Sequence, residues 1–342
     1  MKVTILYNRV TSTQGRPKDI LADEDSVKTA LEIQNNLNTL GLETELLEIT
    51  ENNQADILAH KTDIFFNQSF GLGSIPKTES DVAELLDQTG LPYTGSNSEA
   101  IILTTDKIGT KKLILQNNLP TPNFQIFKST HDRPHPKLHY PLIVKPASED
   151  CSIGIDDNSV VSDLPSLQAK ILELSKTYPG PYLVEEYIAG RELNVTIFGN
   201  GDAAVALPIS EILFDARFAN RPKIISFAGK WEETSEDYRG TSEAKCPAEL
   251  SPDVKARVEE IALIAFKLTG CSDYARVDIR LSLQGDPFIL EVNANPAIGA
   301  TDGAVRSAKA SGLTYQHFLQ SILEFALLRF KRTLKSPHWA QI

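Results

Sequence analysis

The sequence predicts an α/β protein built from three subdomains: a parallel α/β subdomain (residues 1–105), a small central α+β subdomain (106–195) and a C-terminal α+β subdomain (196–342). Strand and helix signals alternate along the N-terminal segment, which is typical of a parallel sheet. The central segment places a helix between groups of strands. The C-terminal segment carries a long helix followed by a hairpin of two alternating strands.

The N-terminal elements follow from hydrophobic periodicity. They are expected to be a strand at 2–7, a helix at 26–40, strands at 44–48 and 63–66, and a short helix at 81–86. Asp25 or Ser26 could cap the first helix, because a short polar side chain accepts hydrogen bonds from free N–H groups. Gly41 is expected to end it. No G-x-G-x-x-G motif follows the first strand, which removes the main support for a dinucleotide-binding site.

The elements of the other two subdomains are predicted in the same way. They are expected to be helices at 105–116, 164–174 and 313–330, strands at 124–127 and 141–146, and two strands around an Ala189-Gly190 turn. Another helix should begin at Pro252, with Ser251 as its cap. Residues 228–250 are rich in Glu and Lys and are expected to form a polar loop.

Composition excludes several classes of protein. The chain has 342 residues, of which 41% are hydrophobic and 23% charged, and this is ordinary for a soluble globular protein. The net charge of −11 argues against a nucleic-acid partner, which needs a basic surface. No apolar run is long enough to span a membrane. The three cysteines lack a C-x-x-C motif, so neither a disulfide framework nor a zinc site is expected, and the cytoplasm is the expected location.

The stretch ARVDIRLSLQGDPFILEVNANPA (275–297) predicts a hairpin with one polar face. Residues on the first strand alternate, with polar side chains on one face: Arg276, Asp278 and Arg280. Apolar side chains occupy the opposite face: Val277, Ile279 and Leu281. On the second strand, strict alternation places Ile289 with Glu291 and Asn293, and places Leu290 with Phe288 and Val292. The Gln284-Gly285-Asp286 segment is suited to the turn.

Pairing in register would bring Asp278, Glu291 and Asn293 together on one face. Three oxygen ligands suit Mg²⁺, which takes one or two carboxylates and completes its shell with water and substrate phosphates. The alternative is a solvated polar face opposite a buried one, which is common for alternating strands.

Lys145 and the loop after it form a candidate phosphate site. Lys145 ends an apolar strand just before the small and polar residues 148–154. Backbone N–H groups in such a loop can approach a phosphate closely, and a lysine adds positive charge. The alternative is a flexible surface hairpin. Lys107 stands at a helix start, and the neighbouring Lys111 and Lys112 are expected to be solvated.

The order of these motifs resembles the D-alanine–D-alanine ligase family of ATP-grasp enzymes. The matching segments are LPYTGS (91–96), DK (106–107), IVKP (143–146), VEEYIAGRE (184–192), ARVDIRL (275–281) and LEVNANPA (290–297). The similarity spans nearly the whole chain and implies the ATP-grasp fold. It also implies an enzyme with small-molecule substrates, and the family admits a homodimer.

The resemblance implies a role for each matching residue in binding ATP. Lys107 and Lys145 would hold its phosphates, and the loop with Cys151 and Ser152 would close over them. The adenine pocket would be lined by Glu185, Glu186 and Ile188, and Glu192 would bind the ribose.

The resemblance also implies catalytic and metal-binding roles. Mg²⁺ or Mn²⁺ would be bound by Asp278, Glu291 and Asn293. Arg276 and Ser152 are the catalytic candidates on the phosphate side. Lys230 would face the second substrate and the transferred phosphate.

Several substrate positions depart from the family pattern. Trp231 replaces the usual Tyr after the active-site Lys. Asp302-Gly303 replaces the Ser–Leu pair that recognises the carboxylate of the second amino acid, and an Asp there would repel a carboxylate. The family's acid for the first ammonium group has three candidates, which are Asp23, Glu24 and Asp25.

These departures lead to three hypotheses. The first is an ATP-dependent ligase that joins an amino acid or amine to a small acid or carbonyl acceptor, for example of the mycosporine-glycine amine ligase type. The second is a D-alanine–D-alanine ligase of peptidoglycan synthesis. The third is a non-catalytic ATP-binding protein, since fold does not fix function.

Overall fold

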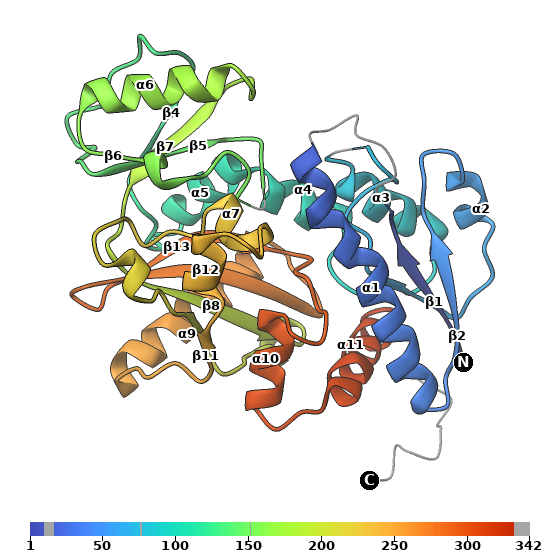
Figure 1. Cartoon of the computed structure of the whole chain (residues 1–342). Helices are drawn as coiled ribbons and strands as arrows, with labels where there is room; N and C mark the ends of the chain where they lie inside the picture. Colours follow the sequence, from blue (N-terminus) through green and yellow to red (C-terminus); the bar gives the residue numbers. More distant parts are fainter. Residues whose placement is uncertain (10–16, 76, 151, 332–342) are drawn as a thin grey trace.

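The structure is a computed structural model that describes residues 1–9, 17–75, 77–150 and 152–331 (Figure 1). Its strands form three separate sheets. The predicted α/β class with three sheet-containing regions agrees with this arrangement. Within the described residues, no helix is both long and apolar enough to cross a membrane.

The N-terminal sheet is parallel, as the alternation of strands and helices predicts. Its centre is β1 (Lys2–Tyr7), which pairs with β2 (Glu43–Glu48) on one side and β3 (Ile64–Asn67) on the other. The helices of this region are α1 (Pro17–Thr39), α2 (Gln54–Leu58), α3 (Glu79–Thr89), α4 (Ser98–Thr105) and α5 (Lys107–Gln116). Of these, α2 and α4 were not predicted.

Helix α1 begins at Pro17 and not near Ser26, so the prediction that Asp25 or Ser26 caps it is wrong. Proline is tolerated in a first helical turn, and no other Pro or Gly interrupts the chain before Gly41. Ser26 therefore lies inside the helix, where its hydroxyl donates to the carbonyl oxygen of Gln68 at 3.2 Å. Gly41 has φ +75° and follows the helix end as predicted.

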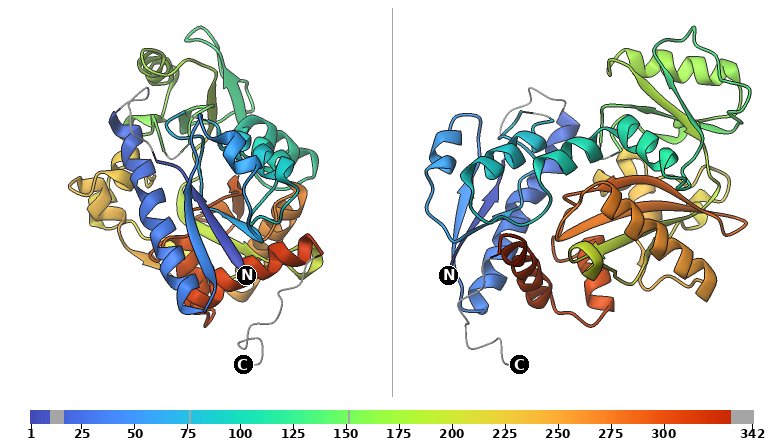
Figure 2. Two further views of the ribbon diagram at one scale, coloured as in Figure 1. Left: turned by 90° about the vertical axis from the view of Figure 1, so that its right-hand side faces the viewer. Right: turned by 180° about the vertical axis from the view of Figure 1, so that it is seen from behind.

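The central sheet is antiparallel and has the order β4–β7–β5–β6. Its strands are β4 (Phe124–Phe127), β5 (Leu142–Pro146), β6 (Val160–Val161) and β7 (Tyr182–Glu186). Helix α6 (Leu164–Ser175) covers one face, and its buried residues share a small core with the strands. Figure 2 shows this layer standing apart from the N-terminal sheet.

The large sheet has the order β11–β10–β8–β12–β13, with β9 added beside β8. Its strands are β8 (Gly190–Phe198), β9 (Val205–Ala206), β10 (Ser210–Ile212), β11 (Ala244–Lys245), β12 (Tyr274–Ser282) and β13 (Pro287–Asn293). The two strands expected around Ala189-Gly190 are β7 and β8, and they belong to different sheets. The predicted boundary at residue 195 therefore falls inside β8.

The face assignment of the second hairpin strand is corrected by a β-bulge. Asp278 pairs with Glu291, but Ile279 pairs with Ile289, so Leu290 has no residue opposite it. The extra residue reverses the alternation on its N-terminal side. Ile289 is fully buried in the core and Leu290 lines a cavity, which is the opposite of the prediction from strict alternation.

The remaining helices close the C-terminal region. They are α7 (Phe227–Trp231), α8 (Glu236–Thr241), α9 (Pro252–Leu268), α10 (Gly303–Ala310) and α11 (Tyr315–Arg329), with short 3-10 turns η1 (Asp157–Ser159), η2 (Gly201–Ala203) and η3 (Ala216–Phe218). Residues 228–250, expected as a loop, contain α8, β11 and most of α7. Helix α11 packs against α1 and joins the core of the N-terminal sheet.

Candidate active site

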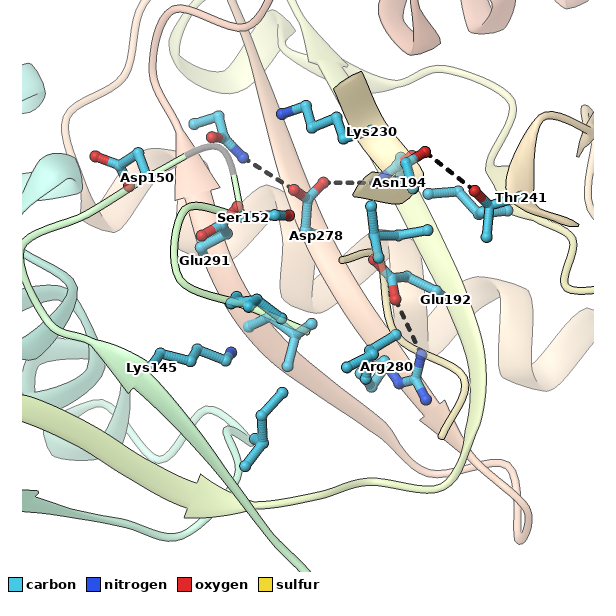
Figure 3. Close-up of a pocket in the computed structure, with 18 of the residues that line it drawn as sticks. Lys145, Asp150, Ser152, Glu192, Asn194, Lys230, Thr241, Asp278, Arg280 and Glu291 are labelled. Carbon is cyan, nitrogen blue, oxygen red and sulfur yellow. Dashed lines mark hydrogen bonds and ion pairs between the residues drawn. The ribbon is translucent and has the colours of Figure 1, made fainter. Parts of the chain in front are cut away.

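A cavity of about 420 Å³ lies between the central sheet and the large sheet (Figure 3). Predicted site residues from five separate segments line it: Lys107, Lys145, Ser152, Glu185, Glu186, Ile188, Glu192, Lys230, Arg276, Asp278, Glu291 and Asn293. The fold thus gathers the motifs in one place. Cys151 lies outside the described residues.

Strand pairing sets the polar face of this cavity. Asp278 on β12 lies opposite Asn194 on β8 and opposite Glu291 on β13, so the three side chains form a row across neighbouring strands. Two residues before Asp278 on β12, Arg276 lies opposite Asn293 of β13 and forms a second row. Because alternate residues of a strand share a face, both rows point into the cavity.

Asp278 is held by cationic and amide donors. Arg276 donates from Nε to Oδ1 at 2.7 Å and from Nη2 to Oδ2 at 2.9 Å. Asn194 Nδ2 donates to Oδ1 at 2.7 Å, and Asn293 Nδ2 donates to Oδ2 at 3.1 Å (Figure 3). Burial would lower the pKa of Arg276, but the attraction of Asp278 raises it above its usual value. The guanidinium is therefore permanently charged beside this carboxylate.

Glu291 is the second carboxylate of the row. Lys107 Nζ lies 3.0 Å from its Oε2, and the attraction of Lys107 lowers the pKa of Glu291 far below its usual range. Lys107 also pairs with Asp150 of the loop after β5. Each carboxylate of the row therefore faces a cation, Arg276 for Asp278 and Lys107 for Glu291.

The donor set fits a hard divalent cation. Asp278 and Glu291 supply carboxylate oxygens, and Asn293 supplies an amide oxygen, while Mg²⁺ is usually bound by one or two carboxylates. Among the described residues, no group of three or more His, Cys, Asp or Glu side chains is placed to hold a metal ion. Two acids and an amide are therefore the side chains here that could hold Mg²⁺.

Lys145 is positioned by a buried ion network. Glu185 is 1% exposed and pairs with Lys145, and its Oε2 lies 2.7 Å from Lys111 Nζ. Burial would raise the pKa of Glu185, but the two lysines lower it to about 2. The prediction that Lys111 is solvated is wrong, since the side chain is 2% exposed. Its partner comes from a distant strand, β7, which helix position alone does not reveal.

Arg280 fixes the point at which the chain passes from the central to the large sheet. Its Nη1 donates to Glu192 Oε2 at 2.9 Å, and its Nη2 donates to the carbonyl oxygen of Ile188 at 3.0 Å. Arg280 and Glu192 lie opposite each other on β12 and β8. The polar face predicted for Arg280 is thus occupied by an ion pair with a neighbouring acid.

The acids of the loop at 148–154 contact lysines outside it. Glu149 Oε1 lies 3.2 Å from Lys77 Nζ, and Asp150 pairs with Lys107. Ser152, a later residue of the same segment, lines the cavity together with Glu149 and Asp150. The two acids therefore connect this side of the cavity to Lys77 and to the start of α5.

Not every predicted substrate residue lines the cavity. Lys230 lines it from α7, but Trp231 does not, and the Lys230 ammonium lies 5.0 Å from the Trp231 ring centroid. Asp302 and Gly303 do not line it either. Asp302 Oδ2 accepts the N–H of Gly299 at 2.7 Å, so its carboxylate is turned toward the preceding backbone.

Comparisons with known proteins agree with this arrangement. A family model described as the D-ala D-ala ligase C-terminus matches residues 113–324. A protein of Methylacidiphilum infernorum named D-alanine--D-alanine ligase is 32% identical over 95% of this chain and 98% of its own length. The chain belongs to the D-alanine–D-alanine ligase family. A Bordetella pertussis ligase of the same name is 32% identical over 96% of each chain. An uncharacterized protein of Sinorhizobium fredii is 33% identical over 80% of this chain.

Solved structures show the same fold. The D-alanine–D-alanine ligase of Bacillus anthracis, solved with ATP, has a TM-score of 0.73 and 26% identity, and the match covers 97% of this chain and 99% of that one. The protein therefore has the ATP-grasp fold that the motif order predicts. It is an ATP- and Mg²⁺-dependent ligase of this family, an enzyme class that forms a carbon–nitrogen bond and releases ADP and phosphate.

Asn194 and Arg306 are among the cavity residues of this ligase that sequence reasoning missed. Asn194 follows Glu192 by two positions on β8, so strand alternation could have placed it on the same face as Glu192. Arg306 follows Asp302 by one helical turn on α10, a helix that was not predicted. The four-residue spacing between Asp302 and Arg306 could therefore indicate a shared helix face only once α10 was known.

Proposed function

We propose that this ligase joins two molecules of D-alanine. The support comes from relatives of the same name that align along almost the whole length of both chains. The mycosporine-glycine amine ligase hypothesis receives no support from the comparisons, and the alternative from the sequence fits them better.

The proposed reaction has two steps. In the first, a carboxylate oxygen of one D-alanine attacks the γ-phosphorus of ATP, the bond to the β-phosphate oxygen breaks, and ADP leaves. In the second, the amine of the other D-alanine attacks the acyl carbon. The carbon–oxygen bond to phosphate then breaks, and the amine gives up a proton. Both steps demand positioning of small charged groups more than covalent help from the protein.

The cavity residues are suited to these steps. Lys107 and Lys145 supply positive charge for phosphate oxygens, and Glu185 and Lys111 hold Lys145 in place. Asp278, Glu291 and Asn293 would hold Mg²⁺, which neutralises phosphate charge when bound. Arg276 is oriented by its two hydrogen bonds to Asp278, and its guanidinium can stabilise the oxyanion that forms at the acyl carbon.

One observation carries the proposal more than any other. The row Asn194–Asp278–Glu291 and the cations around it are built from three strands and two helices of a chain whose relatives are D-alanine–D-alanine ligases. A non-catalytic ATP-binding protein does not need an arginine fixed against a metal-binding carboxylate.

The test is ADP release with Mg·ATP and D-alanine as the only amino acid, with products identified by mass. We expect ADP and D-alanyl-D-alanine in equal amounts. ADP release without the dipeptide, or silence with D-alanine, would contradict the proposal. A panel of L- and D-amino acids paired with D-alanine then tests for a different second substrate.

A further inference from the structure

One segment of the chain after β10 forms a wall of the cavity. This wall segment runs from residue 218 to residue 242, between the end of η3 and the residue after α8. The predicted catalytic residue Lys230 lines the cavity from α7, and Thr241 lines it from the end of α8 (Figure 3). Ile153 and Ile155 also line the cavity, from the chain that leads into β6 of the central sheet. Contacts between these two stretches therefore help to close the cavity to water.

Arg221 connects the wall segment to the chain before β6. Its Nη2 donates to Asp157 Oδ1 at 2.8 Å and also donates to Asp237 of α8. The guanidinium carbon lies 4.5 Å from the centroid of the Phe218 ring, which is buried at the start of the wall segment. A planar guanidinium can pair with acids and stack on a ring at the same time. Arg221 therefore has partners on both sides of the contact.

The two acids need the arginine between them. Asp157 and Asp237 accept from the same nitrogen, so their carboxylates lie close together. Burial and the charge of Asp237 raise the pKa of Asp157, whereas the charge of Arg221 lowers it. Charges that are partly buried are screened less by salt than charges in open solvent. Arg221 thus offsets a repulsion that would otherwise push the wall segment away from Asp157.

Asp237 links Arg221 to the helix that carries Lys230. Ser226 Oγ donates to Asp237 and accepts the N–H of Gly229 at 3.0 Å, which caps the N-terminus of α7. Lys230 lies one turn further along α7 and lines the cavity. A shift of Asp237 would therefore move the cap of α7, and Lys230 with it.

A backbone hydrogen bond crosses the same contact. The N–H of Phe227, the first residue of α7, donates to the carbonyl oxygen of Ile155 at 3.0 Å. This bond joins the wall segment to the chain just before Asp157 and involves no side chain. Exchange of the Phe227 amide hydrogen with solvent deuterium therefore reports whether the wall segment stays in place, independently of activity.

We propose that Arg221 is a positioning residue that holds the wall segment against the chain before β6 during the reaction. This inference rests on the proposed ligase function and adds a residue that acts through Lys230. With the wall segment in place, Lys230 faces the cavity and water is excluded from the acyl phosphate. With it displaced, a water oxygen attacks the acyl carbon, the carbon–oxygen bond to phosphate breaks, and the water gives up a proton. D-alanine and phosphate are then released without dipeptide.

The test counts the ADP released for each dipeptide formed from Mg·ATP and D-alanine. The unaltered enzyme should release one ADP for each dipeptide. Arg221→Gln should release roughly two to five, because a partly exposed ion pair changes an equilibrium by about fivefold at most. The KM for ATP should stay within about twofold of its original value, since Lys107 and Lys145 keep their partners. Arg221→Lys should restore part of the coupling, because it keeps the charge and loses the fork.

Asp157→Ala tests the contact from the other side. It leaves Arg221 paired with Asp237, so the wall segment keeps its internal ion pair and loses the side-chain contact with the chain before β6. The ADP released for each dipeptide should rise, and the Phe227 amide should exchange faster. The double variant Asp157→Ala/Arg221→Gln should be no worse than Arg221→Gln alone, because both changes break the same contact.

Arg217→Gln is the matched control. Arg217 is an arginine of η3 whose ion-pair partners, Asp215 and Glu236, lie next to the wall segment and within it. This variant should release one ADP for each dipeptide and leave the exchange of the Phe227 amide unchanged. Thermal melting of each variant checks that it is folded.

The outcomes are distinguishable. If the unaltered enzyme makes D-alanyl-D-alanine, and folded Arg221→Gln and Asp157→Ala both release one ADP for each dipeptide, the inference is overturned and the proposed function stands. An effect of Arg221→Gln that Asp157→Ala does not share, or losses that add in the double variant, also overturns it. If D-alanine is not joined, the proposed function fails. Amide exchange then decides the inference, which unchanged exchange of Phe227 in both variants overturns and faster exchange supports.

Discussion

The Nζ of Lys107 lies 3.0 Å from Oε2 of Glu291 and also pairs with Asp150. This contact joins a lysine at the start of α5 to a carboxylate on β13 and to the loop after β5 that lines the cavity. Burial alone would lower the pKa of Lys107, but the two acids raise it well above its usual value. The charge of Lys107 is therefore already balanced by protein groups, and a phosphate that binds this lysine would have to compete with them.

Glu291→Gln should abolish Mg²⁺-dependent turnover while the protein stays folded. The amide keeps the shape of the side chain and removes the negative charge that a divalent cation needs. Lys107 keeps Asp150 as a partner, so no buried cation is left alone. We expect kcat to fall by roughly a hundredfold or more, as for other groups that stabilise charge in a transition state.

A magnesium titration of ADP release checks this prediction. Asp286→Asn, an exposed acid in the turn of the same hairpin, is the matched control. Normal turnover of Glu291→Gln at the original magnesium concentration would remove Glu291 from the metal site.

Asp150→Asn should strengthen ATP binding. Asp150 is about half exposed and pairs with Lys107, so it would compete with phosphate for that lysine. An exposed ion pair contributes little, so we expect the KM for ATP to fall by roughly two- to fivefold. Steady-state kinetics at saturating amino acid measure this change.

The comparison needs a second acid that pairs with a lysine outside the cavity. Asp202 pairs with Lys267 and is fully exposed, so Asp202→Asn should leave the KM for ATP unchanged. A higher KM for ATP in Asp150→Asn would show that Asp150 assists nucleotide binding and does not compete with it.

Lys111→Met should destabilise the folded protein. Glu185 is almost fully buried and depends on Lys111 and Lys145 for charge balance, and Lys111 Nζ also donates to Thr121 Oγ1 at 2.8 Å. Removing one partner of a buried ion pair leaves charge uncompensated, and we expect a loss of about 2–4 kcal/mol in the free energy of unfolding. Denaturant titration of the folded protein gives this value.

Lys112→Met is the control, because Lys112 is exposed on the same helix and should change stability by less than about 0.5 kcal/mol. Equal stability of the two variants would contradict the buried network.

Local sequence patterns were sufficient to predict which face of a strand a residue occupies where the strand is regular. The alternation of β12 correctly placed Val277, Ile279 and Leu281 in the core, and Asp278 on the opposite face. The order of the motifs along the chain then predicted the ATP-grasp fold, which the comparisons support. Both inferences rest on regular backbone geometry, which short stretches of sequence encode well.

The errors have causes that lie outside the local pattern. Leu290 and Ile289 exchanged faces because a bulge inserts one residue, and nothing in the alternating sequence marks it. Lys111 was predicted to be solvated because its ion-pair partner, Glu185, lies far away in sequence, on β7 of the central sheet. Arg306 was overlooked because it lies on α10, a helix that was not predicted.

Glu79→Gln should make stability less dependent on pH in the absence of substrates. Burial raises the pKa of Glu79 from 4.5 to about 7, although a hydrogen bond from Asn295 opposes the shift. Between these two pH values the folded protein binds more protons than the unfolded chain, so its stability falls as pH rises. The contribution is full below about pH 4.5 and is lost as pH rises through about 7. Glutamine stays neutral, so at pH 8 the variant should be more stable than the original protein by about 1–2 kcal/mol, and the two should converge near pH 5.

Denaturant unfolding at pH 5 and pH 8 measures the difference, with Glu84→Gln on the exposed face of the same helix as control. A variant whose advantage is the same at both pH values would show that Glu79 titrates normally in the folded state.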